Sequence, residues 1–505
     1  MKPLASSALR DSFLRFGERG LQAAALALLA LLLVKAAVDI SHHFDSWWYH
    51  LPWAARLVGL VGADAYLFEP IAAARYDGFP LLPELLQGLA WRLTGRVESA
   101  NLINFVALVA FIAFLRHFFR VSWWLAVPAL LAVPLVQAHA TSTYVDLIAN
   151  LAMAAMVLLA YLFYAKPDTV RPAPLVVLGL CAFIAAHSKF QLIPLVAIAS
   201  AFAAIPILRQ MLARPATDGM ARRPALALIV FALALSAVFW VPLKNLYLHG
   251  NPVYPIQISV LGHKLNGPEM LPPEDLGGGA IESSNRVTKW FYSVTEIGMG
   301  DIRNVKRWTL DSAAPEGSPL GIQGGLFGAY VILNLLVFAW LAARIPRRER
   351  FVAVAFVGLV TVLAAVMPAS HLLRYYMFWF IALISLNLYL LTQQHATAPN
   401  LVAGGICMVF VLIVIDATDQ NFVRPQFRST SDLLAERVDQ RILAQLRDAE
   451  PVCLALDAAS QPFLYASIWH PGTNYSIKAG PFKPVYSNEV VQTCENRRVV
   501  FTPRQ

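Results

Sequence analysis

The apolar run LQAAALALLALLLVKAAVDI, residues 21–40, leads directly into the polar and aromatic stretch SHHFDSWWYHLP, residues 41–52. About 20 apolar residues suffice for a helix to cross the hydrocarbon core of a bilayer. The run therefore predicts a membrane-spanning helix, and the stretch after it predicts a loop that places Asp45 at the membrane surface. Lys35 and Asp39 stand near the end of the run. Because membrane burial of a charge is costly, such residues are expected to be functional or paired, or to reach the interface with their charged ends.

Apolar runs of the same kind recur along the whole chain. Of its 505 residues, 58% are hydrophobic and only 14% are charged, a balance typical of proteins that cross a membrane many times. The prolines inside one run, Pro128 and Pro134, are tolerable where neighbouring helices satisfy the freed carbonyl groups. We expect an all-α polytopic membrane protein with about eleven spans, centred in 21–40, 99–116, 121–138, 144–164, 174–187, 190–208, 224–243, 322–343, 351–368, 375–392 and 400–416.

Basic residues are distributed unequally between the two sides of these spans. The short turns on one side contain only Lys189 and Arg374. The opposite ends carry Lys2, Arg10, Arg15, Arg19, Arg116, Arg120, Lys166, Arg171, Arg209, Arg214, Arg222, Arg223, Arg344, Arg347, Arg348 and Arg350. Because cytoplasmic loops carry the excess of Lys and Arg, we expect a cytoplasmic N-terminus and a periplasmic C-terminus in a bacterial inner membrane. The net charge of +9 then reflects membrane orientation, and no nucleic-acid-binding motif accompanies it.

Three segments outside the spans are expected on the outer face of a transmembrane domain that covers residues 1–416. The first outer loop, 41–98, has patterns of short amphipathic helices that lie in the membrane interface. The second, 244–320, is rich in Gly and Pro and predicts a long loop with little regular structure. The third, 417–505, predicts a small extracytoplasmic α/β module.

This C-terminal module combines one helical pattern with two strand-like runs. The helix is expected over Ser431–Glu450 and the strands over Val452–Leu456 and Val499–Thr502. Cys453 and Cys494 both fall in the module, so an oxidising compartment permits a disulfide between them; two buried free thiols are the alternative.

The loop after the first span gathers residues with chemical potential. Asp45, Tyr49, Pro52 and Arg56 follow a spacing of four, three and four, so one continuous helix would present them on one face. Pro52 can instead start a new helix and interrupt that face.

Three histidines, His42, His43 and His50, lie close to Asp45 in the same loop. A divalent metal is one interpretation, but the spacing matches no known zinc site. We therefore predict no metal and no cofactor.

The loop and several later motifs resemble the polytopic glycosyltransferases of the GT-C fold, which include the bacterial aminoarabinose transferases and the protein mannosyltransferases. In order along residues 20–395, the motifs are Phe44-Asp45-Ser-Trp-Trp-Tyr49-His50-Leu-Pro52, Phe79-Pro80-Leu-Leu-Pro83-Glu84, Tyr144-Val-Asp146-Leu, Ser188-Lys189-Phe-Gln191, His249-Gly250-Asn251-Pro252-Val-Tyr254 and His371-Leu-Leu-Arg374-Tyr375. The chain departs from the commoner pattern in Ser46, where the family has Glu, and in Phe190, where it has Gly.

The resemblance implies transfer of a sugar from a polyprenyl-phosphate carrier to a glycan, lipid or protein acceptor, with inversion at the sugar. Such a reaction needs a base for the acceptor hydroxyl and cations for the leaving phosphate. Asp45 is the expected base. The expected donor-phosphate site comprises Arg374, Lys189, Tyr375 and His371, and the expected substrate contacts are Tyr49, His50, Arg56, Asp146, His249 and Tyr254. Structural explanations are open for several of them, since Arg374 and Lys189 can be interfacial cations and Asp146 can belong to a helix end.

Two other functions remain as alternatives. A transporter or flippase of a lipid-linked glycan predicts polar residues through the middle of several spans and two similar halves, and no internal repeat is evident. A structural partner in an envelope complex would use its C-terminal module for docking. No phosphate-binding glycine loop, zinc-protease motif or nucleophile elbow is present.

Overall fold

The computed structural model is mostly helical. It describes residues 4–41, 43, 45–61, 70–213, 229, 232, 235–260, 262–270, 284–298, 304–306, 323–394, 397–429, 432, 454–456 and 499–501. Within these residues, six helical stretches are long and apolar enough to cross a membrane. They are Ser12–Val38 in α1 (Leu4–Val38), Val97–Phe119 in η2 (Val97–Asn101) and α5 (Leu102–Phe119), α8 (Asp146–Ala165), Phe190–Gln210 in η4 (Phe190–Leu192) and α10 (Ile193–Ala213), α15 (Arg347–Val366) and α17 (Thr397–Ala417).

Three shorter apolar helices occupy further predicted spans in the described chain. They are α9 (Pro172–Ser188), α14 (Phe327–Ala342) and α16 (Phe378–Thr392). Part of the predicted span 224–243 lies outside the described residues, which include only 229, 232 and 235–243 of it, so the number of eleven stays a prediction.

The expected span 121–138 is a broken helix. It forms α6 (Trp123–Leu131) and α7 (Pro134–Ala140), whose axes are bent by 102°. Pro134 starts α7, and Val133 before it is extended, because a proline ring disfavours the helical conformation in the preceding residue. The break turns the chain toward the loop 141–145, and the span 121–138 stays a prediction.

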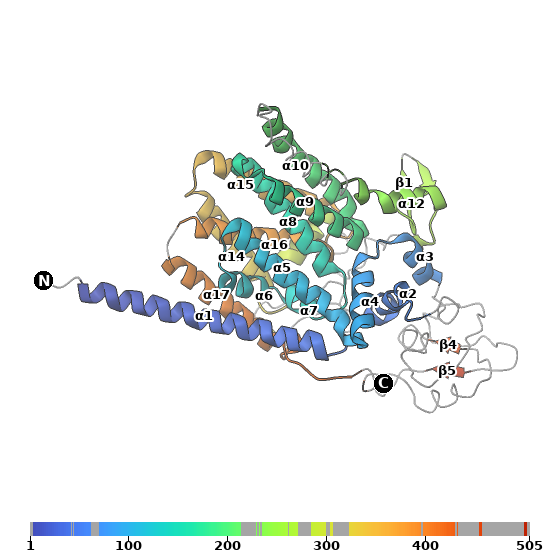
Figure 1. Cartoon of the computed structure of the whole chain (residues 1–505), viewed down its shortest axis with the longest axis horizontal. Coiled ribbons are helices and arrows are strands. Elements are labelled where there is room, and N and C mark those ends of the chain that lie inside the picture. Colours follow the sequence, from blue (N-terminus) through green and yellow to red (C-terminus); the bar gives the residue numbers. More distant parts are fainter. Residues whose placement is uncertain are drawn as a thin grey trace.

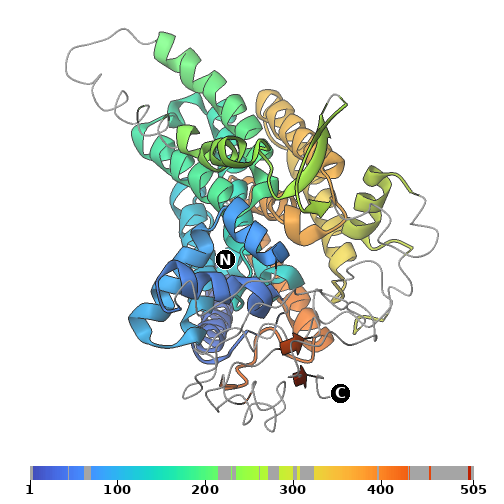
Figure 2. The ribbon, with the colours of Figure 1, turned by 90° about the vertical axis from the view of Figure 1, so that its right-hand side faces the viewer.

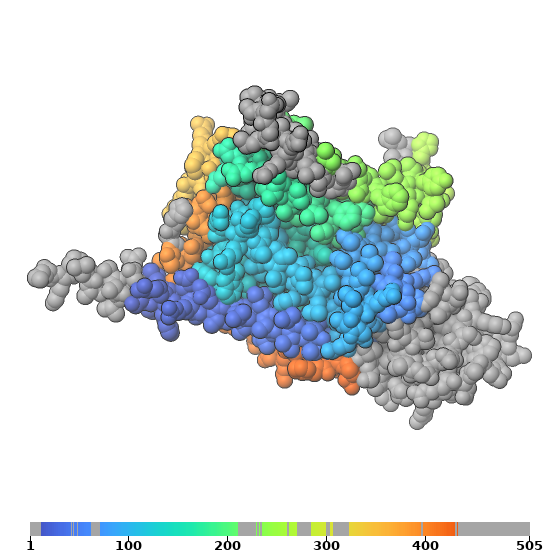
Figure 3. Space-filling model, in the orientation of Figure 1, coloured from blue at the N-terminus to red at the C-terminus, as the bar shows by residue number. Residues whose placement is uncertain are grey.

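Helix α8 lies at the centre of the bundle. It packs against α5, α9, α10, α15 and α16, and its side chains are buried from Asp146 to Phe163 (Figure 1). Small residues such as Ala149, Ala152 and Ala155 allow the neighbouring helices to approach closely. As a result, Asp146, in the first turn of α8, is enclosed by protein. By contrast, α1 lies along the outside of the bundle beside α17 (Figure 3).

Short helices gather at the end of the bundle where α1 ends (Figure 1). The chain leaves α1 through a π-helical turn, η1 (Ser46–His50), and continues into α2 (Leu51–Leu57). Helices α3 (Pro70–Gly78) and α4 (Leu82–Thr94) follow. The helices α2 and α4 pack against each other at Gly88, where a Cβ atom would overlap the Ala54 carbonyl oxygen.

Replacement of Gly88 by alanine is expected to separate α2 from α4 and to destabilise the protein by about 1–3 kcal/mol, since overpacking forces the backbone to shift. The control is Gly405→Ala in α17, where the added methyl group meets no atom within 4 Å. Thermal unfolding in detergent compares the two variants. Equal melting temperatures for Gly88→Ala and the unaltered protein would contradict the close packing.

The segment 244–320 contains more regular structure than its composition suggested. Helix α12 (Trp240–His249) is followed by β1 (Ile256–Val260), β2 (His263–Leu265) and β3 (Glu269–Met270), in the order β2-β1-β3. Strand β1 pairs antiparallel with β2 and parallel with β3 (Figure 2). Helix α13 (Arg286–Thr295) begins at Asn285, whose side chain accepts a hydrogen bond from Thr288 N. The alternation of apolar and polar residues in 256–260 is the signal of a strand that the Gly and Pro content obscured.

The chain after α17 returns to the C-terminal end of α1, where Ile40 N donates to the Arg428 carbonyl oxygen. Two strands, β4 (Leu454–Leu456) and β5 (Val499–Phe501), pair in parallel within the predicted module. The predicted helix Ser431–Glu450, apart from Asp432, and both Cys453 and Cys494 lie outside the described residues. The module and its disulfide therefore stay predictions.

Candidate active site

The predicted base and the predicted phosphate-binding arginine form an ion pair. Arg374 Nη1 donates a hydrogen bond of 3.0 Å to Asp45 Oδ2, although 329 residues separate them. The two side chains are 22% and 14% exposed, so the pair lies at the edge of the buried interior. Asp45 precedes η1, and Arg374 belongs to η6 (Leu373–Tyr376), the turn between α15 and α16.

Asn150 in α8 fixes the position of the turn that carries Arg374. Its Nδ2 donates to the Arg374 carbonyl oxygen at 3.1 Å, and its Oδ1 accepts from Phe378 N at 2.9 Å. The Arg374 guanidinium then lies 5.3 Å from the ring centroid of Tyr144 and 5.2 Å from that of Tyr375. Aromatic faces attract cations, so both rings favour the observed orientation of Arg374.

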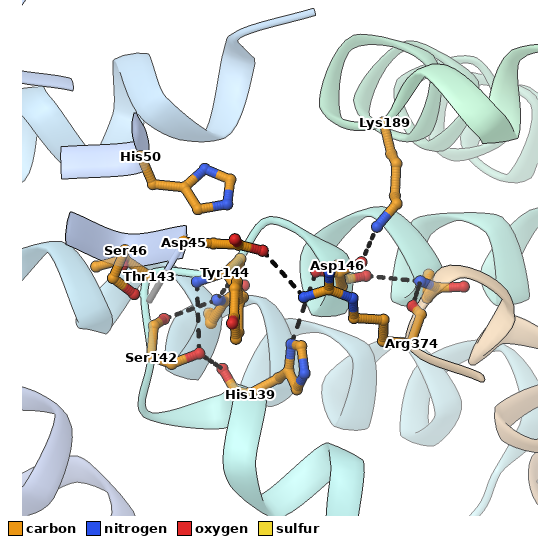
Figure 4. A network of polar contacts seen from close by, with 12 residues as sticks. Asp45, Ser46, His50, His139, Ser142, Thr143, Tyr144, Asp146, Lys189 and Arg374 are labelled. Carbon is orange, nitrogen blue, oxygen red and sulfur yellow. Dashed lines mark hydrogen bonds and ion pairs between the residues drawn. The ribbon is translucent and has the colours of Figure 1, made fainter. Parts of the chain in front are cut away.

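A second acid and cation pair lies deeper. Lys189 Nζ donates to Asp146 Oδ1, and the side chains are only 8% and 4% exposed. Lys189 caps the C-terminus of α9 and lies 4.0 Å from the ring centroid of Tyr375. Asp146 Oδ2 is 4.0 Å from His139 Nδ1. Tyr375 thus contacts both cations, and Figure 4 shows the two pairs approaching from four separate segments of the chain.

Other buried amides hold the loop 141–145 between α7 and α8. Asn104 Nδ2 donates to the carbonyl oxygens of Ser142 and Tyr144, at 2.8 and 2.5 Å. Gln87 Nε2 donates to the Thr143 carbonyl oxygen at 2.8 Å. These bonds fix the Tyr144 ring, which stacks on His139 with a centroid distance of 4.9 Å.

Tyr49 and Arg75 lie on the other side of Asp45. The Arg75 guanidinium is 5.7 Å from the Tyr49 ring centroid and is hydrogen-bonded through Nε to Glu269 Oε2 at 2.9 Å. Burial, followed by the negative charge of Asp45, raises the pKa of Tyr49 well above its ordinary value, so this phenol stays protonated at physiological pH. Burial is the largest single influence on Arg75 and lowers its pKa. The hydrogen bond to Glu269 and the nearby negative charges together outweigh burial and raise the pKa, so Arg75 stays charged.

The single helical face expected for Asp45, Tyr49, Pro52 and Arg56 does not form. Asp45 precedes the π-turn and Tyr49 lies within it, and the α-helix begins only at Leu51, with Pro52 in its first turn. A π-turn has wider spacing than an α-helix, so the four-residue periodicity is interrupted. Arg56 lies over the ring of Tyr76 in α3, 5.3 Å from its centroid.

His50 does join the site, through a partner that the sequence did not suggest. His50 Nδ1 and Glu84 Oε1 lie 2.7 Å apart, and the side chains are 3% and 2% exposed. The His50 ring also meets the Tyr144 ring edge-on, at a centroid distance of 5.9 Å.

His249 and Tyr254 form a separate cluster at α3. Their rings stack at a centroid distance of 3.7 Å, and His249 Nε2 lies 2.7 Å from Asp77 Oδ2. Asn245 Nδ2 also donates to the Gly78 carbonyl oxygen at 2.8 Å. These contacts hold α12 against α3, a structural role that accounts for both residues. His371 is buried in the turn before η6.

Lys35 and Asp39 pair with each other inside the protein. They form a buried pair at 2.8 Å, and the Asp39 carboxylate accepts hydrogen bonds from the backbone N–H groups of Gln426 and Phe427. Lys35 Nζ donates to the Arg424 carbonyl oxygen at 3.2 Å. The pair therefore joins the outer end of α1 to the segment that follows α17.

No group of three or more metal-ligating side chains occurs among the described residues. His42 lies outside them, so the metal-free site stays a prediction.

The sequence missed several residues that shape the site: Tyr144, His139, Glu84, Asn150 and Arg75. Asn150 gave a signal, because an amide inside an apolar span is costly unless it bonds to another segment. Glu84 ends a proline-rich motif, and nothing in that motif indicates His50 as its partner.

The described helices form the bundle of a polytopic membrane protein, in which the acid after the first span meets a cation from a late turn. Two crystal structures of ArnT from Cupriavidus metallidurans share this fold, one in the apo state and one bound to undecaprenyl phosphate. Their TM-scores are 0.50 and 0.51, at 14% sequence identity, over 88% of this chain and 84% of the ArnT chain. No protein-family model and no curated protein sequence matches the chain. The likeness confirms the expected GT-C-like helical fold, whereas the eleven spans and the C-terminal module stay predictions.

Proposed function

We propose that this protein is a membrane glycosyltransferase that moves a sugar from a polyprenyl-phosphate carrier to an acceptor at the outer face of the membrane. The observation that carries the proposal is the Asp45–Arg374 pair, with the Lys189–Asp146 pair beside it. The shared fold with a protein that was crystallised with undecaprenyl phosphate supports it.

In the proposed reaction the lipid phosphate competes with Asp45 for Arg374. Arginine binds phosphate with two parallel hydrogen bonds, so an arriving phosphate draws Arg374 away and frees the Asp45 carboxylate. Asp45 then accepts the proton of the acceptor hydroxyl, whose oxygen attacks the anomeric carbon. The bond between that carbon and the phosphate oxygen breaks, and its electron pair stays on the phosphate. A single displacement of this kind inverts the sugar.

Arg374 and Lys189 stabilise the charge that develops on the departing phosphate. Tyr375 contacts both cations through its ring. Tyr49 keeps its phenolic proton because its pKa is raised, so its hydroxyl group donates a hydrogen bond to the substrate. The proposed reaction uses no cofactor.

The proposed topology has eleven spans, a cytoplasmic N-terminus and a periplasmic C-terminus in a bacterial inner membrane. The unequal distribution of Lys and Arg supports it. The acceptor is a glycan, a lipid or a protein of the envelope.

The direct test gives the purified protein a set of polyprenyl-phosphate sugars and measures the release of free polyprenyl phosphate. Release that depends on an added envelope acceptor is the expected result. A transporter of lipid-linked glycans would leave the donor covalently intact. No release from any donor of the set would overturn the proposal.

Replacement of Arg374 by glutamine is expected to weaken the binding of polyprenyl phosphate by about 10- to 100-fold, since a hydrogen bond to a charged group contributes about 1.5–3 kcal/mol. The control is Arg171→Gln, at an exposed arginine that hydrogen-bonds to the Asp168 carbonyl oxygen at 3.1 Å. Titration of both variants with labelled polyprenyl phosphate measures the effect. Unaltered affinity in Arg374→Gln would remove this residue from the phosphate site.

A further inference from the structure

A buried histidine and a buried glutamate form a pair at the end of the turn that the proposed base precedes. His50 Nδ1 and Glu84 Oε1 are 2.7 Å apart, and both side chains are almost completely enclosed. His50 ends the π-turn that Asp45 precedes, and Glu84 lies in the first turn of α4. The pair therefore connects the segment of the base to a second helix of the first outer loop.

The enclosure of Glu84 is energetically costly. Its Oε2 is buried and finds no hydrogen-bond partner in the described part of the chain. A buried carboxyl group with an unsatisfied oxygen destabilises a protein, and a neutral amide would serve as a structural link at lower cost. An ionisable pair at such a position is typical of functional sites.

The orientation of the pair points toward the site. Glu84 occupies the Nδ1 side of the His50 ring, so Nε2 is the ring nitrogen on the opposite side. The His50 ring meets Tyr144, and Tyr144 in turn contacts the guanidinium of Arg374 that binds Asp45. Figure 4 shows the His50 imidazole and the Asp45 carboxylate extending from the same turn toward this group.

We propose that His50, oriented by Glu84, takes from Asp45 the proton of the acceptor hydroxyl and passes it to water. The inference rests on the proposed function and names a second proton-accepting residue for it. The hydroxyl proton moves first to the Asp45 carboxylate and then to His50 Nε2. The Nδ1 proton stays in the hydrogen bond to the Glu84 carboxylate, and the imidazolium finally releases one proton to solvent.

The two-step transfer solves a problem that the Asp45–Arg374 pair creates. A protonated Asp45 no longer attracts Arg374, so the site regains its resting pair only after this proton has left. A neutral imidazole whose other nitrogen donates to a carboxylate is a suitable acceptor, because the carboxylate stabilises the imidazolium that forms.

Several titratable groups surround His50 and define its electrostatic environment. Glu84 faces it from α4, Tyr49 and Asp45 belong to its own turn, and Tyr144 faces it from the loop before α8. Three further groups, His43, His139 and Arg374, lie around Tyr144. The ring centroid of Tyr144 is 4.8 Å from that of His43 and 4.9 Å from that of His139.

The test compares Glu84→Gln and His50→Ala with the unaltered protein in the polyprenyl-phosphate release assay. Glutamine preserves the size and the accepting oxygen of Glu84 but removes its charge. The matched control is Glu98→Gln, because Glu98 is another acid of the same region and pairs with Arg96 at 3.6 Å instead of with His50. Melting temperatures establish that each variant is folded.

For Glu84→Gln we expect kcat to fall by about 10- to 100-fold, with an unaltered KM for the lipid donor, since positioned proton transfer contributes about 10²–10⁴-fold. The pH profile of kcat should also differ between the unaltered protein and Glu84→Gln. Added imidazole should restore activity to His50→Ala and leave Glu98→Gln unchanged.

The inference fails if Glu84→Gln keeps the original kcat and pH profile, or if imidazole does not restore His50→Ala, while the unaltered protein releases polyprenyl phosphate. In that case the proposed function survives and the pair is structural. If the unaltered protein releases nothing from any donor, both the inference and the proposed function are overturned.

Discussion

Sugar transfer is expected to fall by about 10²–10⁴-fold when Asp45 is replaced by asparagine, since an amide cannot accept the proton of the acceptor hydroxyl. The side chain keeps its size, and its amide oxygen still accepts a hydrogen bond from Arg374. The binding of polyprenyl phosphate should therefore persist, or increase, because Arg374 is no longer held by a negative charge. Parallel measurements of turnover and of lipid binding separate the two effects.

The matched control for this variant is Asp168→Asn. Asp168 is an aspartate of the turn η3 (Pro167–Thr169), which follows α8 at the end opposite Asp146. Its replacement should leave turnover unaltered. Full activity in a folded Asp45→Asn protein would exclude Asp45 as the base and transfer the proposed role to another acid of the outer face.

The second large effect concerns the stability of the protein. Lys189→Met leaves the Asp146 carboxylate buried beside a neutral side chain, and Asp146→Leu leaves the Lys189 ammonium in the same position. Breaking a buried ion pair by removal of one partner costs about 3–5 kcal/mol, because the remaining charge is uncompensated. Each single variant is expected to unfold at a much lower temperature in detergent.

The double variant Lys189→Met/Asp146→Leu separates stability from function. It contains no unpaired charge, so most of the lost stability should return. Its activity should stay low if Lys189 also stabilises the leaving phosphate. The control is Lys306→Met, which removes an exposed partner of Asp416 at 3.8 Å and should leave the melting temperature unchanged. Single variants as stable as the unaltered protein would contradict the buried pair.

The hydrophobic pattern was sufficient to predict most of the membrane-embedded helices. Long apolar runs such as 21–40 and 400–416 correspond to α1 and α17, because backbone groups in a bilayer must be satisfied within a helix. The apolar run 121–138 did not indicate the break between α6 and α7, because apolarity alone does not reveal that Pro134 starts a new helix. The strand 256–260 was overlooked because the glycines and prolines around it were given more weight than its alternation.

The site could be predicted residue by residue but not contact by contact. The position of Asp45 after the first span and of Arg374 before a late span placed both at the same side of the membrane. Neither position revealed that the two side chains touch, since this depends on how α8 and η6 pack. Lys189 was predicted as a free phosphate ligand, and its pairing with Asp146 became visible only with the packing of α9 against α8.

The hydrogen bonds from Gln426 and Phe427 to Asp39 link the beginning of the chain to a segment made almost four hundred residues later. During synthesis the first helix enters the membrane long before Gln426 and Phe427 are made. Until then the Asp39 carboxylate lacks these two hydrogen-bond donors. The hydrogen bonds next to the loop that starts at Ser41 form only when α17 has been inserted and the chain after it has turned back. A chain that ends before residue 427 therefore lacks the hydrogen bond from Phe427 to Asp39, which holds the end of α1 next to this loop.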